Sequence, residues 1–176
     1  YKRQAMLCGR IRRGPAARQL AGALAGLLAV PHVLPVNSGR TALRLGLEAR
    51  MQLRPGRNEV IIPAFICPAV VEVVNSLGLV PVLADVGADL NLDPGACEQR
   101  IGSRTLAIIV AHMYGCPAKI EAFETIAKAA RVYLVDDAAQ VVGESVGGRM
   151  LGTFGDFGVL SFAQSKCVVT GESGGG

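Results

Sequence analysis

The sequence predicts a three-layer α/β/α sandwich built on a mostly parallel sheet. Short apolar runs that suit buried strands alternate with amphipathic helical stretches, at spacings of roughly 20 to 30 residues along the chain. One of these runs, residues 106–111, is apolar at every position, as strands covered on both faces are. With 51% hydrophobic residues among 176, the chain has enough apolar surface for one compact domain or for part of a larger one.

The first elements follow from proline, leucine and a Ser-Gly turn. Residues 16–29 are expected to form a helix, because Pro15 suits a first helical turn and four leucines make one apolar face. This stretch is too short to cross a bilayer, so we expect a buried amphipathic helix. Residues 32–36 are expected to form a short strand, after which the turn at Ser38 and Gly39 opens a second helix.

Strands and helices then alternate through the rest of the chain. The expected order is strand 59–62, helix 68–77, strand 80–84, helix 93–101, strand 106–111, helix 118–130, strand 132–135, hairpin 143–150 and strand 158–163. Pro63 ends the first of these strands, Gly78 closes the helix that follows, and Asp93 and Pro94 start the next helix. Two adjacent glycines, Gly147 and Gly148, supply the tight turn of the hairpin.

Charge and cysteine content narrow the class of protein. The net charge is +4, but six of the 18 lysines and arginines lie in the first 18 residues and the remainder is close to neutral. We interpret residues 1–14 as a solvated basic N-terminal arm rather than a nucleic-acid patch. The five cysteines form no C-x-x-C pair, which argues against a zinc site and for reduced thiols in a cytoplasmic protein. Neither a metal nor a membrane partner is expected.

Several polar residues follow directly after predicted strands. They are residues 37–41, Asp85, His112, Asp137 and Lys166. In open parallel sheets ligands bind at the carboxyl ends of the strands, so one cleft is expected to hold all of these residues.

Lys166 is the candidate catalytic residue. It follows the apolar strand 158–163 and precedes a glycine-rich turn. Burial favours the neutral amine of a lysine, which can then attack an aldehyde and form a Schiff base. Pyridoxal phosphate is the cofactor that uses such a lysine.

The other residues of the predicted cleft suit the same cofactor. A helix start at Gly39, Arg40 and Thr41 offers N–H groups, a guanidinium and a hydroxyl to a phosphate. Asp137 can pair with a protonated pyridine nitrogen, and Ser161 can place a second hydroxyl on the phosphate.

Four motifs in this order resemble the DegT/DnrJ/StrS family of fold-type I pyridoxal-phosphate enzymes, which are mostly sugar aminotransferases. They are NSGRTAL at 37–43, NEVIIPA at 58–64, DDAAQ at 136–140 and SFAQSK at 161–166. The resemblance implies that Lys166 forms the Schiff base and moves the proton, that Asp137 holds the pyridine nitrogen, and that Gln140 faces the ring. It also implies transfer of an amino group from glutamate or glutamine to a nucleotide-linked keto sugar, by a homodimer.

Two departures from the family pattern bear on function. Where many members stack an aromatic ring on the cofactor, this chain has Cys67, which we interpret as a packing thiol. Family members are about twice as long. Residues 1–176 therefore resemble a truncated large domain without the C-terminal small domain, and we expect this fragment alone to be inactive.

Three alternatives stay open at the level of sequence. A dehydratase or other eliminase could use the same scaffold, but the family's sugar dehydratases have histidine where this chain has Lys166. A truncated relative could keep the fold without catalysis. A nicotinamide-binding domain is disfavoured, because no G-x-G-x-x-G follows the first strand. His112 is interpreted as a structural histidine rather than a base.

Overall fold

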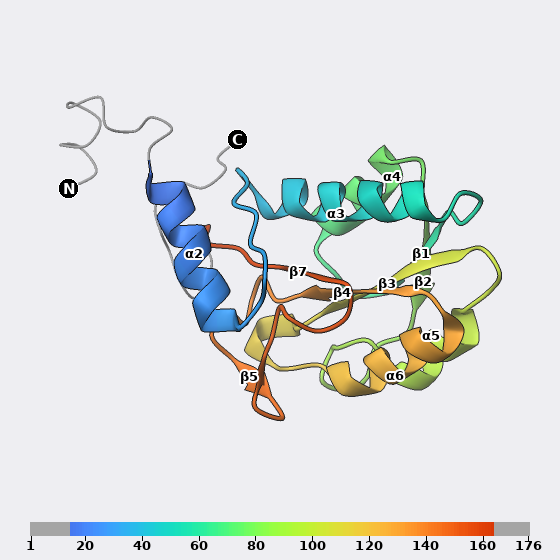
Figure 1. Cartoon of the computed structure of the whole chain (residues 1–176). Helices are drawn as coiled ribbons and strands as arrows, with labels where there is room; N and C mark the ends of the chain where they lie inside the picture. The colour runs from blue at the N-terminus through green and yellow to red at the C-terminus, as the bar shows by residue number, and fades with distance from the viewer. Residues whose placement is uncertain (1–14, 164–176) are drawn as a thin grey trace.

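The structure, a computed structural model, describes residues 15–163 and shows helices on both sides of a central sheet (Figure 1). The helices are α2 (Ala16–Leu28), α3 (Gly39–Leu53), α4 (Pro68–Ser76), α5 (Pro94–Arg100), α6 (Ile120–Ala130) and the 3-10 turn η1 (Met113–Gly115). The strands are β1 (Glu59–Pro63), β2 (Val80–Ala84), β3 (Thr105–Ala111), β4 (Tyr133–Asp137), β5 (Ser145–Val146), β6 (Arg149–Met150) and β7 (Phe157–Val159). The predicted basic arm and Lys166 lie outside the described residues.

The central sheet has five strands in the order β2-β1-β3-β4-β7, and every neighbouring pair is parallel. Helices α3 and α4 lie over one face and α5 and α6 over the other (Figure 1). The predicted three-layer α/β/α architecture with a mostly parallel sheet is therefore confirmed. The hairpin of β5 and β6 is antiparallel, as its paired glycines predict.

Alternating side chains of the strands divide the core into two layers. Val60 and Ile62 pack with Leu43 and Leu47 of α3, whereas Ile61 packs on the opposite face among residues of α5 and α6. All seven residues of β3, the central strand, are buried. Each fully buried leucine or isoleucine contributes about 1.5–3 kcal/mol, so the two layers stabilise the sheet from both sides.

The segment 32–36 is not a strand, contrary to the prediction. Pro31 and Pro35 have no N–H to donate to a ladder, and the segment pairs with none of the described strands. Helix α2 does form where it was predicted, but only Leu28 of its residues is buried, so the expectation of a buried helix is wrong. No helix within residues 15–163 has the length and apolar character needed to span a bilayer.

Strand β7 ends at Val159, four residues earlier than predicted. Its partner β4 ends at Asp137, which lies opposite Val159, so the ladder has no further residues to pair. The backbone N–H of Ala138 donates a last hydrogen bond to the Val159 carbonyl at 3.0 Å. Ser161 therefore lies in irregular chain just past the strand end, not within a strand.

Candidate active site

A cavity of about 880 Å³ lies at the carboxyl ends of β3, β4 and β7. Its volume is within the range of roughly 300–1,000 Å³ that small-molecule sites occupy. Five predicted site residues share its wall: Gly39 and Arg40 at the start of α3, Asp137 at the end of β4, Gln140 just after it, and Ser161 after β7. The strand-end rule therefore holds for His112 after β3, Asp137 at the end of β4 and Ser161 after β7.

Asp85 was predicted to share this cleft but is not part of the described wall. It follows β2, the edge strand, which is separated from β3 by β1. The end of an edge strand on the far side lies too many strand spacings from β4 and β7 to meet them.

The first turn of α3 forms one side of the cavity. Ser38 is the N-cap, and its Oγ accepts a hydrogen bond from the N–H of Thr41 at 3.2 Å. The N–H groups of Gly39 and Arg40, in the first turn, have no carbonyl within the helix to bond. A β-carbon placed on Gly39 would lie 4.0 Å from Cβ of Ser161. The helix start and Ser161 therefore face the same space, which suits a phosphate.

The side chains of Arg40 and Thr41 are engaged elsewhere. The hydroxyl of Thr41 donates a hydrogen bond to Oδ1 of Asn37 at 2.6 Å. Thr41 itself is not part of the wall of the large cavity. The Arg40 guanidinium lies 3.9 Å from the carboxylate of Glu72, with both side chains mostly exposed. Surface pairs of this kind are weak, so an anion could draw Arg40 away from Glu72. The backbone N–H groups at the start of α3 are therefore better placed to donate hydrogen bonds to an anion than the side chains of Arg40 and Thr41.

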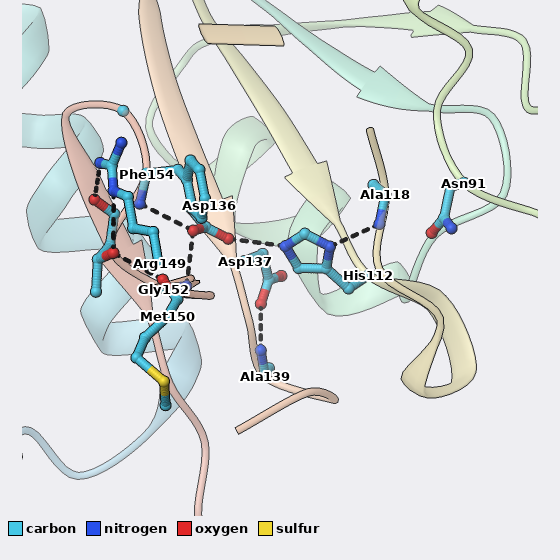
Figure 2. Close-up of polar contacts among 12 residues, drawn as sticks. Asn91, His112, Ala118, Asp136, Asp137, Ala139, Arg149, Met150, Gly152 and Phe154 are labelled. Atoms are coloured by element: carbon cyan, nitrogen blue, oxygen red, sulfur yellow. Dashed lines mark hydrogen bonds and ion pairs between the residues drawn. The ribbon is translucent and has the colours of Figure 1, made fainter. Parts of the chain in front are cut away.

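Asp137 is the last residue of β4 and lines the cavity. Its Oδ1 accepts a hydrogen bond from the N–H of Ala139 at 3.1 Å, which orients the carboxylate (Figure 2). An ionised carboxylate only accepts hydrogen bonds, so a protonated ring nitrogen is a suitable donor for it.

Gln140 lies on the cavity wall three residues further on. Its Oε1 accepts the backbone N–H of Tyr114 at 3.0 Å. Tyr114 has φ of 52°, a left-handed conformation that is unfavourable for an aromatic residue, and its side chain is exposed. Gln140 thus holds a strained turn beside the cavity.

Asp136 and His112 form a buried pair at this wall, and His112 is one of the residues that line the cavity (Figure 2). Both side chains are fully buried, and Nε2 of His112 lies 2.8 Å from Oδ1 of Asp136. Nδ1 of His112 accepts the N–H of Ala118 at 2.9 Å, which leaves the ring proton on Nε2 to donate to Asp136. Both ring nitrogens are bonded, so the interpretation of His112 as a structural histidine is supported.

Cys67 lines the cavity and is exposed, so its interpretation as a packing thiol is wrong. It is the N-cap of α4, and Pro68 occupies the first turn of that helix. The neighbouring aromatic, Phe65, lies with its ring centroid 6.3 Å from that of Tyr114. Within the described residues no group of three or more histidine, cysteine, aspartate or glutamate side chains is arranged to hold a metal ion.

The described part of the cavity wall suits both the phosphate and the ring nitrogen of pyridoxal 5′-phosphate. The unpaired N–H groups of the α3 start suit the phosphate, and the oriented carboxylate of Asp137 suits the ring nitrogen. Lys166 is three residues beyond Ala163, the last described residue, which also lines the cavity.

Comparison with known proteins identifies the family. The model of the DegT/DnrJ/EryC1/StrS aminotransferase family matches residues 2–175. The chain belongs to this family. Its aminotransferases depend on pyridoxal 5′-phosphate, in agreement with the cofactor predicted from the sequence.

Two of the relatives that this chain matches are aminotransferases by name. L-glutamine:2-deoxy-scyllo-inosose aminotransferase of Micromonospora echinospora is 39% identical over 158 residues, which are 89% of this chain and 37% of that protein. The UDP-N-acetyl-3-dehydro-alpha-D-glucosamine 3-aminotransferase of Acidithiobacillus ferrooxidans is 36% identical and covers 92% of this chain and 44% of its own length.

A solved structure shares the fold of this chain. DesV of S. venezuelae superposes with a TM-score of 0.84 at 32% identity, covering 94% of this chain and 45% of its own. The chain thus spans about two fifths of the length of the relatives that it matches.

Some features of the cavity were missed at the level of sequence. Leu20, Leu24 and Leu28 of α2 and the irregular segment 30–36 line it. The leucine periodicity of α2 predicted an apolar face, but nothing local indicated that this face lies along a ligand cavity. The His112 to Asp136 bond was also missed, although strand alternation places Asp136 and Asp137 on opposite faces.

Proposed function

We propose that the chain forms part of the cofactor-binding large domain of an enzyme that transfers an amino group from glutamate or glutamine to a keto sugar carried by a nucleotide. The observation that carries this proposal is the single cavity shared by the start of α3, Asp137, Gln140 and Ser161. The names of the relatives support the substrate class: one uses glutamine and another acts on a UDP-linked keto sugar.

The residues divide the work by chemistry. The N–H groups of Gly39 and Arg40, with the hydroxyl of Ser161, would hold the phosphate. Asp137 would keep the proton on the ring nitrogen, and Gln140 would border the ring. When bound, pyridoxal 5′-phosphate supplies an aldehyde that takes up the amino group and a ring that withdraws electrons from the reacting carbon.

Lys166 would attach the cofactor covalently and move the proton at the substrate carbon. The described chain approaches the cavity at Leu160, Ser161 and Ala163, all of which line it. A residue three positions beyond Ala163 is within about 10 Å of that wall along the chain, so an attachment point there is within reach.

The test uses the purified protein with pyridoxal 5′-phosphate. We expect a new absorption band, covalent attachment to Lys166 after borohydride reduction, and loss of the attachment in Lys166→Ala. Lys128→Ala is the matched control, because Lys128 is exposed on α6 and faces solvent. In the whole enzyme of which this chain is proposed to be part, glutamate or glutamine should discharge the band, and a nucleotide-linked keto sugar should restore it.

Two outcomes would contradict the proposal. Labelling spread over surface lysines, with no band, would indicate a relative that keeps the fold without catalysis. A band that no amino donor discharges would indicate an eliminase on the same scaffold.

A further inference from the structure

Asp136 joins two chain segments through one carboxylate. Its Oδ1 accepts from His112, and its Oδ2 accepts from the N–H groups of Gly152 at 2.6 Å and Phe154 at 3.0 Å (Figure 2). The carboxylate is fully buried, so three donors are needed to offset its desolvation. Charge-assisted hydrogen bonds of this kind are about twice as strong as neutral ones.

His112 extends the same network to β3 and its following loop. The residue comes directly after β3, and Nδ1 of its ring holds the N–H of Ala118 at 2.9 Å. The His112 and Asp136 side chains therefore connect the ends of β3 and β4 with two loops, one at Ala118 and one at Gly152. All four segments lie at or behind the wall of the cavity.

The loop at Gly152 also contacts β7. A β-carbon on Gly158 would lie 1.9 Å from the carbonyl oxygen of Gly152, so the loop and the strand are in direct backbone contact. Strand β7 leads into Ser161, which faces the α3 start. Any shift of Asp136 would therefore move Asp137, its neighbour in the chain, and the loop that supports β7.

We propose that His112 and Asp136 are a positioning pair, which holds the carboxylate of Asp137 toward the ring nitrogen of the cofactor. The inference rests on the proposed function. Its logic is geometric: adjacent residues of a strand point to opposite faces, so fixing Asp136 on one face fixes the direction of Asp137 on the other. Asp136 is not part of the cavity wall. His112 is part of it, but its side chain is fully buried and both of its ring nitrogens are bonded within the protein, so the pair acts on the cofactor through Asp137.

Two substitutions of His112 separate its two hydrogen bonds. In His112→Gln the amide nitrogen reaches about as far as Nε2 and can still donate to Asp136. In His112→Asn the carbonyl oxygen lies where Nδ1 was and can still accept from Ala118, but nothing reaches Asp136. If the bond to Asp136 positions the site, the Gln variant keeps more cofactor affinity than the Asn variant.

Asp136→Asn gives an independent break of the same bond. If its oxygen keeps the N–H groups of Gly152 and Phe154, its amide faces His112. A neutral imidazole has one proton, so a donor then meets a donor at either Asp136 or Ala118. This variant should behave like His112→Asn.

Thr105→Val is the matched control. Thr105 is fully buried in the same strand, β3, at its opposite end, and its Oγ1 accepts the N–H of Gly102 at 2.9 Å. The substitution removes one part-buried hydrogen bond at a residue that is not part of the cavity wall. It should lower stability to a similar degree and leave cofactor affinity unchanged.

The experiment titrates the purified protein and each variant with pyridoxal 5′-phosphate and with an analogue that has carbon in place of the ring nitrogen. We expect His112→Asn and Asp136→Asn to weaken pyridoxal 5′-phosphate at least about tenfold, or ~1.4 kcal/mol, and to leave the analogue unchanged. Equal weakening of both ligands, equal affinity of the Gln and Asn variants, or an effect of Thr105→Val as large would overturn the inference. A wild-type protein that binds neither ligand would overturn the proposed function itself.

Discussion

Replacement of Gly158 by alanine should separate β7 from the loop that supports it. The added β-carbon would lie 1.9 Å from the Gly152 carbonyl oxygen, 2.5 Å from its carbonyl carbon and 2.8 Å from its Cα. Carbon and oxygen atoms that are not bonded stay about 3.3 Å apart or more, so the backbone must move by over ~1 Å. Rotation of a side chain cannot relieve this clash, because all three atoms belong to the backbone.

The cost follows from the contacts that would shift. Overpacking alone costs about 1–3 kcal/mol. Moving Gly152 also strains its hydrogen bond to the Asp136 carboxylate, and a bond to a charged group contributes about 1.5–3 kcal/mol. We therefore expect Gly158→Ala to lower the free energy of unfolding by about 4 kcal/mol, a large share of the ~5–15 kcal/mol of a typical domain.

Urea denaturation followed by circular dichroism measures this loss directly. Gly102→Ala is the control, because a β-carbon on Gly102 meets no atom within 4 Å, and its effect should stay within about 0.5 kcal/mol. If Gly158→Ala costs less than about 1 kcal/mol, the loop and β7 are not packed against each other as described, and the support argued for Ser161 fails.

Three further changes test other parts of the structure. Burial, with smaller contributions from Glu98 and Asp93, raises the pKa of the Cys97 thiol to about 12, so iodoacetamide at pH 8.5 should label exposed Cys67 but not Cys97, by peptide mass spectrometry. The stability from keeping this thiol neutral is complete below about pH 8.5 and declines as the pH rises toward 12. Tyr114→Asn should raise the free energy of unfolding by about 0.5 kcal/mol, because asparagine tolerates the left-handed backbone. A free energy of unfolding below that of the wild-type protein would show that the backbone at Tyr114 is not strained. Asp93→Ala should lower it by about 1 kcal/mol through loss of the α5 N-cap, and an unchanged urea midpoint would show that the cap adds nothing.

Most helices and strands could be predicted because their signals are local. Proline, glycine and capping residues set boundaries within a residue or two, as at Pro63, Gly78 and Asp93. The two misjudged segments, 32–36 and 158–163, are those whose strand character depends on a partner. Sequence patterning cannot show that β4 ends at Asp137 and leaves the later residues unpaired.

The site was predictable in position but not in side-chain direction. Strand ends brought Asp137 and Ser161 to one cavity, as the topology of parallel sheets requires, whereas Gly39 reaches it at the start of α3 after a segment that is not a strand. The side chain of Arg40 is directed toward Glu72 of α4, and that of Thr41 toward Asn37 in the preceding loop. Contacts of this kind cannot be predicted from the residues of the helix start alone.

Asp136 and Asp137 are adjacent in β4, but Asp136 is buried and Asp137 lines the cavity. The alternation of side chains along the strand explains the difference. Val135, two residues before Asp137, packs in the core layer with Leu43 of α3, so Asp137 lies on the α3 side. Helix α3 begins at Gly39 and leaves that side open to the cavity beyond the strand end, whereas Leu134 marks the opposite, filled layer for Asp136. Asp136 must therefore be satisfied internally, by His112 and two backbone donors, while Asp137 is presented to the cavity. Of two neighbouring aspartates, the one whose side chain is on the same face of β4 as α3 can therefore meet a ligand, and the other cannot.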